Sequence, residues 1–228
     1  MSYHLSAEPE KILGVEFSPG VWPHVAFDIP VTERMQFDSP SKGIDMEFRL
    51  TYEGSLRAKK DHEQSHAIRR QFHRQLSTLW ATHGLLKPLR ESSLRFERLI
   101  EPRYGFNFVP LVRESLSLGC GLDILFLRRE APGRIVSGGD IDNRITVLVD
   151  ALTMPENREQ VRGITPEADE DPLFCLLEKD KFIYELNVTT DRLLWPAKPG
   201  EDLNSVHIVI QVKVIVLDPS KTWVGWGL

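Results

Sequence analysis

The fold of this chain is best predicted from the stretch Gly138-Gly-Asp-Ile-Asp-Asn-Arg-Ile-Thr-Val-Leu-Val-Asp150, which is followed by Ala151-Leu152. It sets Asp140 and Asp142 two residues apart, just before an apolar run. If the chain from Gly138 to Asp142 is extended, both carboxylates point to the same side. Carboxylate oxygens suit a divalent cation. The alternative interpretation is structural, with Asp140 ending a strand and Asp142 capping a helix.

The residues around this stretch predict a strand, then a helix. Residues 120–128 alternate between apolar and polar side chains, which is typical of a strand. After Asp142 the apolar residues recur at helical spacing, and the opposite, more polar face carries Asn143, Thr146 and Asp150. The carboxylates therefore lie where a strand is followed by a helix.

Similar patterns place further elements. Residues 46–52, 182–188 and 206–216 alternate as strands, and residues 61–83 carry apolar residues at three- and four-residue steps, which predicts an amphipathic helix. Residues 173–177 are expected to form a short helix behind Asp171 and Pro172. The sequence thus predicts an α/β (α+β) fold with one mixed sheet of about four or five strands and flanking helices.

The domain organisation is predicted from polar and Pro-bearing segments. Residues 1–44 contain five prolines and no sustained period, so we expect an N-terminal extension packed on a body formed by residues 45–228. A polar, acidic loop at about 153–172 is predicted to be inserted into this body. The most apolar run, residues 206–217, is too short and too polar to cross a membrane, and no secretory signal is apparent, so a cytoplasmic protein is expected.

Charge is unevenly distributed along a chain whose net charge is −5. Residues 55–104 carry eleven Lys and Arg against five Asp and Glu. A basic region opposite a carboxylate cluster suits a polyanion such as DNA, whereas the alternative is an ordinary solvated helix face. The residues predicted to bind nucleic acid are Lys59, Lys60, Arg69, Arg70, Arg74 and Arg144.

Three histidines of the predicted helix at 61–83 also share helical spacing. His62, His66 and His73 are four and seven residues apart, as metal ligands on one helix face would be. No Cys or carboxylate joins them at ligand spacing, so a polar helix face is the favoured interpretation. The two cysteines, Cys120 and Cys175, lie in apolar segments and are expected to be reduced core thiols.

The opening stretch resembles a known family signature. Gly139-Asp-Ile-Asp-Asn143 running into Val149-Asp-Ala-Leu152 is similar to the Asp-Leu-Asp-Asn…Asp-Ala-Leu signature of the RusA-like Holliday junction resolvases, including the eight-residue step from Asp142 to Asp150. The expected order of elements over about residues 46–217 also agrees with that family. The resemblance implies a Mg²⁺-dependent endonuclease, with Mn²⁺ as a substitute, that cuts branched or duplex DNA as a homodimer.

The resemblance also implies site residues. A later acidic pair in the family completes the metal site, and Leu176-Leu-Glu-Lys-Asp-Lys-Phe-Ile183 resembles that segment, with Asp180 as its second Asp and Lys179 in place of the first. Asp140, Asp142 and Asp180 are thus the expected catalytic metal ligands. The rival register uses Glu170-Asp171. Asn143, Asp150 and Asp171 are expected to support the site.

One departure from the family pattern concerns Thr146. The family typically has a Lys four residues after the second motif Asp, and a Thr hydroxyl cannot supply that cation.

The leading hypothesis for the function follows from the resemblance and is a structure-selective endodeoxyribonuclease of DNA recombination and repair. The alternatives are a catalytically weakened, RusA-like nucleic-acid-binding or interaction module, or a metal-dependent nuclease of phage or defence origin that acts on another nucleic acid.

Overall fold

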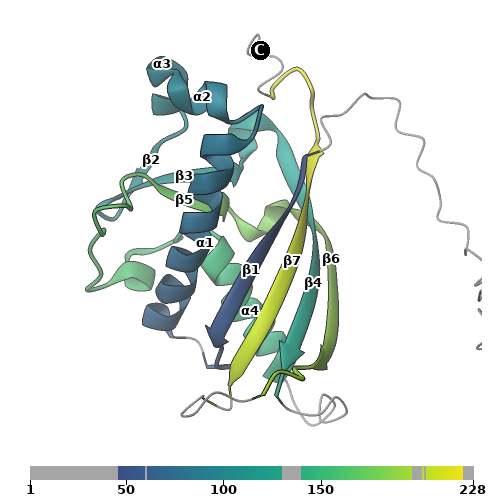
Figure 1. Ribbon diagram of the computed structural model, residues 1–228. Helices are drawn as coiled ribbons and strands as arrows, with labels where there is room; N and C mark the ends of the chain where they lie inside the picture. The colour runs from purple at the N-terminus through teal and green to yellow at the C-terminus, as the bar shows by residue number, and fades with distance from the viewer. Residues whose placement is uncertain (1–45, 60, 130–139, 197–201, 203, 223–228) are drawn as a thin grey trace, which may run out of the picture. The chain divides into compact units, whose positions relative to one another are not determined.

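A computed structural model describes residues 46–59, 61–129, 140–196, 202 and 204–222 (Figure 1). The predicted N-terminal extension at 1–44 and Lys60 lie outside these residues, and only the backbone of Asp140 is described. None of the helices in this part of the chain is long and apolar enough to span a membrane.

The described strands form two sheets. Sheet A has the spatial order β1 (Met46–Ser55), β7 (Ser205–Val216), β4 (Leu118–Arg128) and β6 (Ile183–Arg192). Its first three strands are antiparallel neighbours, whereas β6 runs parallel to β4. Sheet B has the order β2 (Glu101–Arg103), β3 (Phe106–Val112) and β5 (Leu173–Leu177), with β5 parallel to β3. The α/β fold class is confirmed, with its strands divided between two sheets.

The described helices differ greatly in length. The two long ones are α1 (His62–Thr82) and α4 (Asp140–Leu152), and the short ones are α2 (Lys87–Glu91) and α3 (Ser93–Glu97). Single 3-10 turns follow at η1 (Glu114–Leu116), η3 (Arg158–Val161) and η4 (Asp180–Phe182). Asp61 caps α1, since its side chain accepts a hydrogen bond from the backbone N–H of Glu63. The helix predicted at 61–83 is confirmed.

A single large core lies between sheet A and the helices. Alternate residues of β4 and β7, such as Leu122, Ile124, Ile210 and Val212, are buried on one side of the sheet. The helical stripe predicted for α1 meets them, and its Trp80 is one of the largest buried side chains. Burying these side chains removes apolar surface from water, which is the main force that holds the layers together.

Helix α1 also satisfies the edges of both sheets, beside which it lies in Figure 1. On β1, the backbone N–H of Thr51 donates to Oε1 of Gln75 (2.9 Å), and Nε2 of Gln75 donates to the carbonyl of Thr51 (2.7 Å). On β5, the backbone N–H of Phe174 donates to Nδ1 of His73 (2.9 Å). The proton of this ring is therefore on Nε2, which donates to the carbonyl of Asp169 (2.8 Å). At Thr51 and Phe174, side chains of one helix thus provide hydrogen bonds that a neighbouring strand would otherwise supply.

Three expectations are corrected by this packing. Residues 173–177 form strand β5 rather than a helix, because all five are buried and pair in sheet B. The loop expected at about 153–172 is not simply exposed, since Glu170 and Val161 are buried against the body. His66 and His73 do not form a polar helix face, because each is buried where α1 meets sheet B.

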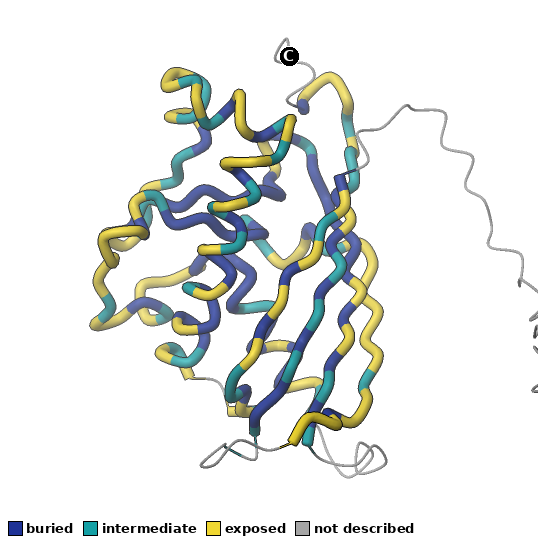
Figure 2. Tube along the Cα trace, viewed as in Figure 1, coloured by how far each residue is buried: buried dark blue, intermediate teal, exposed yellow. Residues whose placement is uncertain are grey.

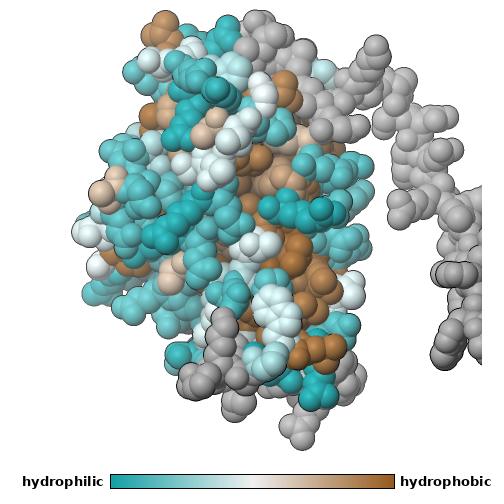
Figure 3. Space-filling model, in the orientation of Figure 1, coloured by the Kyte–Doolittle hydropathy of each residue, from teal (hydrophilic) through white to brown (hydrophobic). Residues whose placement is uncertain are grey.

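Strand β6 differs from the other long strands. It is the terminal strand of sheet A, and most of its residues are exposed, as the tube at the right of Figure 2 shows. On the view in Figure 3, apolar residues gather over the strands of sheet A, beside the more hydrophilic surface of α1. The helical layer that covers β1, β7 and β4 therefore leaves β6 uncovered among the described residues.

Replacing the buried edge contact of His73 should destabilise the fold more than replacing the exposed one of Gln75. We expect His73→Phe to lower the free energy of unfolding by about 2–3 kcal/mol, because the N–H of Phe174 and the carbonyl of Asp169 lose their partner inside the protein. Gln75→Ala should cost about 1 kcal/mol, because water reaches Thr51. Urea unfolding curves measure both values, and equal losses would contradict this account.

Candidate functional site

The predicted metal-binding motif lies at one end of sheet A. Asp140 is the first residue of α4, and Asp142 and Asn143 are exposed in its first turn. Nη2 of Arg144 donates to Oδ1 of Asn204 (3.3 Å), and Asn204 immediately precedes β7. Because β7 begins where β4 ends, with Val206 opposite Arg128, the first turn of α4 lies beside the start of β7, at the end of sheet A where β4 and β6 also end.

The backbone at this position is helical rather than extended. Residues two apart on a helix do not face each other, so the same-side argument for an extended Gly138–Asp142 segment does not apply from Asp140 onward. The hydroxyl of Thr146 donates to the carbonyl of Asp142 (2.9 Å), which places Thr146 one turn above this residue. The position where the family carries a Lys thus holds a neutral side chain bonded to its own helix.

Asp180 lies far from the end of sheet A that carries the Asp142 motif. It begins η4, directly before β6, and the first residue of β6, Ile183, pairs with Cys120 near the start of β4. The β4–β6 ladder then runs from Cys120 to Arg128, about 26 Å. Asp180 and Asp142 therefore lie at opposite ends of a long parallel pair, so the expected ligand set does not fit a metal site within one chain.

The other predicted carboxylates have separate surroundings. Asp171 is exposed at the start of β5 and accepts a hydrogen bond from Asn107 of β3 (2.8 Å), so it belongs to sheet B. Asp150 lies eight residues beyond Asp142 on α4, about 12 Å along the helix axis, where its carbonyl accepts from Arg69. Among the side chains that the structure describes, no group of three or more His, Cys, Asp or Glu could hold a metal ion.

The predicted nucleic-acid-binding residues separate into different roles. Arg69 is 2% exposed and donates to the carbonyls of Thr153 (3.2 Å) and Asp150 (2.8 Å), so it joins α1 to the end of α4. Arg144 is 4% exposed. These two side chains therefore stabilise the fold instead of presenting a charge to DNA, which corrects the expectation for them.

The two other arginines predicted on α1 face carboxylates of the segment that follows η3. Arg70 bonds Glu170 (2.6 Å) and pairs with Glu167 (3.0 Å), and Arg74 lies 3.6 Å from Asp169. Burial acts to raise the pKa of Glu170, but its hydrogen bonds outweigh that effect and lower it. This segment thus largely neutralises the basic helix face, and sequence reasoning missed that pairing because the partners lie about a hundred residues away.

Exposed cations remain at the end of sheet A that carries the motif. Arg57 and Lys59 follow β1, and Arg57 lies 4.0 Å from Asp202. Asp202 accepts hydrogen bonds from Asn204 and Ser55, which lower its pKa. A continuous set of polar contacts therefore links Arg57 to the first turn of α4 through Asp202, Asn204 and Arg144.

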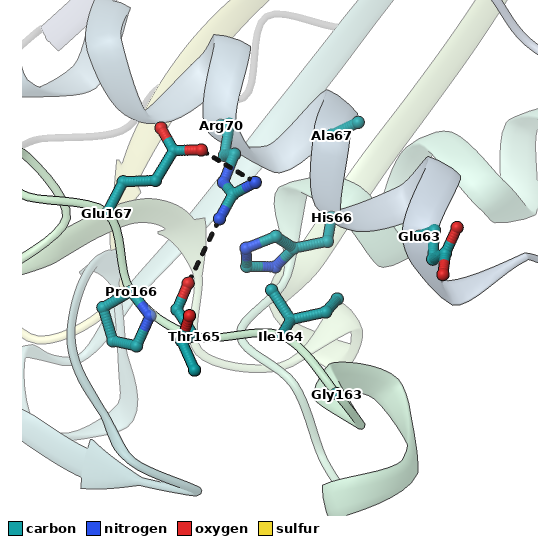
Figure 4. A pocket seen from close by; sticks show the side chains of 9 residues that line it. All are labelled: Glu63, His66, Ala67, Arg70, Gly163, Ile164, Thr165, Pro166 and Glu167. Carbon is teal, nitrogen blue, oxygen red and sulfur yellow. Dashed lines mark hydrogen bonds and ion pairs between the residues drawn. The ribbon is translucent and has the colours of Figure 1, made fainter.

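A separate pocket of about 440 Å³ lies between α1 and residues 163–167 (Figure 4). Its wall includes His66, whose Nδ1 accepts from Nη1 of Arg69 (3.2 Å) because a guanidinium only donates. Burial and the nearby arginines lower the pKa of His66 to about 4, so the ring is neutral. Arg70, also in the wall, is already engaged by Thr165 and Glu167. Among the residues that line this pocket, every positively charged side chain is therefore already paired within the protein.

Comparison with protein-family models, with curated proteins and with solved structures finds no match in any of the three. The likeness to RusA-like resolvases rests only on the motif residues and the order of elements.

Truncating Arg69 should weaken the fold. We expect Arg69→Ala to lower the free energy of unfolding by about 3 kcal/mol, because the carbonyls of Asp150 and Thr153 lose a buried charged donor. Arg74→Ala, on the exposed part of the same helix, should change it by less than about 0.5 kcal/mol. Denaturant titration of both variants is the measurement, and similar losses would contradict a structural role for Arg69.

The neutral state of His66 predicts a dependence of stability on pH. Since its pKa is about 4 in the folded protein and about 6.5 when unfolded, the unfolded state binds the extra proton first as pH falls. Stability should therefore fall by up to about 3 kcal/mol between pH 6.5 and pH 4. In His66→Gln this part of the slope should be absent, and an unchanged slope would show that His66 titrates normally.

Proposed function

We propose that this chain is a divalent-metal-dependent endonuclease that hydrolyses phosphodiesters in branched DNA, in recombination or repair. The observation that carries the proposal is the exposure of Asp142 and Asn143 in the first turn of α4, within the Gly-Asp-Ile-Asp-Asn motif. The cations of Arg57 and Lys59 lie exposed at the same end of sheet A. An exposed carboxylate at the same end of a sheet as exposed cations suits a metal ion and a polyanionic substrate.

The contacts favour a reduced set of DNA-binding residues. Arg57 and Lys59 are exposed, whereas Arg69 and Arg144 are buried, and Arg70 and Arg74 face acidic side chains. A phosphate backbone would therefore be bound at the end of sheet A rather than along α1. Each exposed Lys or Arg that neutralises a phosphate adds to the salt dependence of binding.

A second candidate is a nucleic-acid-binding module that does not cut. It is favoured by Thr146, whose hydroxyl bonds the carbonyl of Asp142 at the position where the family has a cation. Binding to a junction that chelator leaves unchanged, together with no cleavage, would support this candidate over the nuclease. A nuclease that acts on another nucleic acid would be separated from both by a panel of duplex, branched and single-stranded substrates.

Cleavage of a synthetic four-way junction tests the proposed activity. We expect nicking with Mg²⁺ or Mn²⁺, none with EDTA, and a loss of about 100-fold or more in Asp142→Asn, because a ligand carboxylate is replaced by an amide. Asp123→Asn is the matched control, since Asp123 is exposed on β4, outside the motif. No nicking by the natural sequence, or equal nicking by Asp142→Asn, would contradict the proposal.

A further inference from the structure

Two hollows of about 580 and 480 Å³ lie side by side along η3. Both are lined by Glu159, within η3, and by Arg162, which follows it. The larger hollow extends to the start of α1 and to Arg57, at the end of sheet A, whereas the smaller one extends to Tyr104, in the turn between β2 and β3. Together they form one depression, which we call the η3 groove, from the end of sheet A to this turn.

Positive side chains line the η3 groove from one end to the other. Arg57 and Lys59 are exposed at its sheet A end, and Arg158 and Arg162 are exposed on η3 and directly after it. Neither Lys59 nor Arg158 forms an ion pair with another described residue. Arg162 pairs with Glu159 (3.4 Å), but its side chain is 79% exposed, so this ion pair is weak and the guanidinium stays accessible. A row of accessible cations along a hollow suits an anionic chain.

Carboxylates in the same groove offset most of this charge. Among the described residues that line it, the three carboxylates of Asp61, Glu63 and Glu159 accompany four Lys and Arg. Asp61 is engaged at the start of α1, where it accepts a hydrogen bond from the backbone N–H of Glu63 (3.0 Å). The groove is therefore only slightly positive, and charge alone would hold an anionic chain weakly. A ligand of this groove needs a further contact.

Tyr104 offers that contact at the far end of the groove. Its ring is 41% exposed, and its hydroxyl donates to the carbonyl of Glu156 (2.7 Å), which holds it against the segment before η3. Tyr104 and Gly105 form the two-residue turn between β2 and β3, with φ values of 52° and 88°. Gly or Asn adopts such values readily and a bulky residue rarely does, so Tyr104 stands there at a conformational cost. Strain of this kind is concentrated at binding and catalytic sites.

We infer that the η3 groove binds single-stranded nucleic acid, whose phosphates lie along its Lys and Arg side chains and one of whose bases stacks on Tyr104. An exposed aromatic face attracts any base that is not already stacked, whatever its identity. A duplex has no such base to offer, because its bases are stacked on one another. A groove that combines cations with an aromatic ring therefore selects single strands.

The groove begins at cations of the proposed nuclease site, so its role in cleavage rests on the proposed function. Arg57 is joined to the first turn of α4 by polar contacts through Asp202 and Asn204. A strand that passes from the exposed Asp142 to Arg57 thus reaches the entrance of the groove. Forked DNA carries an unpaired strand beside its duplex, whereas a continuous duplex does not. The groove therefore specifies the substrate as branched DNA with an unpaired strand next to the cleaved phosphodiester.

Binding of a labelled oligothymidylate of about 12 nucleotides tests the role of Tyr104. Measured by fluorescence anisotropy in EDTA, the affinity of Tyr104→Asn should be about 10-fold below that of the natural sequence, because the stacked ring is lost. Asn is the chosen replacement because it tolerates the left-handed backbone conformation of this turn. Tyr104→Phe, which keeps a ring, should retain the natural affinity to within about threefold.

A continuous duplex of the same length provides the comparison. We expect the natural sequence and Tyr104→Asn to bind it equally, because none of its bases is free to stack on the ring. The inference would be overturned by no measurable binding of the oligothymidylate, by an unchanged affinity in Tyr104→Asn, or by an equal loss for duplex and single strand. A loss in Tyr104→Phe as large as that in Tyr104→Asn would also contradict it.

Salt dependence tests the path of the phosphates. Each contact with a phosphate of a single strand adds about 0.7 to the slope of log affinity against log salt concentration. The double variant Arg158→Ala with Arg162→Ala should therefore reduce the magnitude of this slope by about 1.4. Arg49→Ala with Arg98→Ala is the matched control, because it removes the same charge from exposed positions on β1 and after α3, neither of which lines the groove. Equal changes in both double variants would show that only net charge acts, against a path along the groove.

Binding and cleavage are measured separately, so the two proposals can fail separately. If the oligothymidylate binds through Tyr104 but no junction is nicked, the proposed nuclease activity fails while the groove stands. If a junction is nicked but Tyr104→Asn binds the single strand as tightly as the natural sequence does, the groove is overturned while the nuclease stands. Where the chain nicks, Tyr104→Asn should reduce its preference for a fork over a continuous duplex, and an unchanged preference would overturn the role of the groove in cleavage.

Discussion

The hydrogen bonds that α1 makes to the edges of two sheets are the constraint on which the rest of the structure depends. Gln75 bonds both backbone groups of Thr51 on β1, and His73 bonds Phe174 on β5. Because these bonds fix one helix against both sheets, its apolar stripe meets sheet A while Arg69 reaches the end of α4. The position of α4, and therefore of the Asp142 motif, follows from this central helix.

Local periodicity was sufficient to predict most elements. The alternation in β1, β4 and β7 and the stripe of α1 are direct consequences of burying one face, so the pattern is visible without a structure. The exception is β5, which was predicted as a short helix although it is a strand whose five residues are all buried. A strand buried on both faces shows no alternation, and periodicity then cannot separate it from a short helix.

The predicted roles of charged residues depended on contacts that are distant in sequence. Arg70 and Arg74 were expected to bind DNA, but Glu167, Asp169 and Glu170 face them from the segment that follows η3. Arg69 carries the same charge and is almost wholly buried. Sequence spacing placed these residues on one helix correctly. It contained no information about which other element covers that helix.

The predicted grouping of the carboxylates also depended on contacts that the sequence does not show. The motif of Asp140 and Asp142 begins α4 at one end of sheet A, while Asp180 begins η4 at the other end of the β4–β6 pair. Family likeness predicts that these residues act together, and the fold separates them within one chain. The central claim of the proposed function is therefore that the exposed Asp142 motif at the start of α4 binds the metal ion, without Asp180 of the same chain.

A crystal structure of the full chain with Mn²⁺, analysed by anomalous scattering, tests this claim most directly. The account predicts a Mn²⁺ peak beside Asp142, at the first turn of α4. The absence of a peak at Asp142, or a peak held by Asp142 and Asp180 of the same copy, would contradict it.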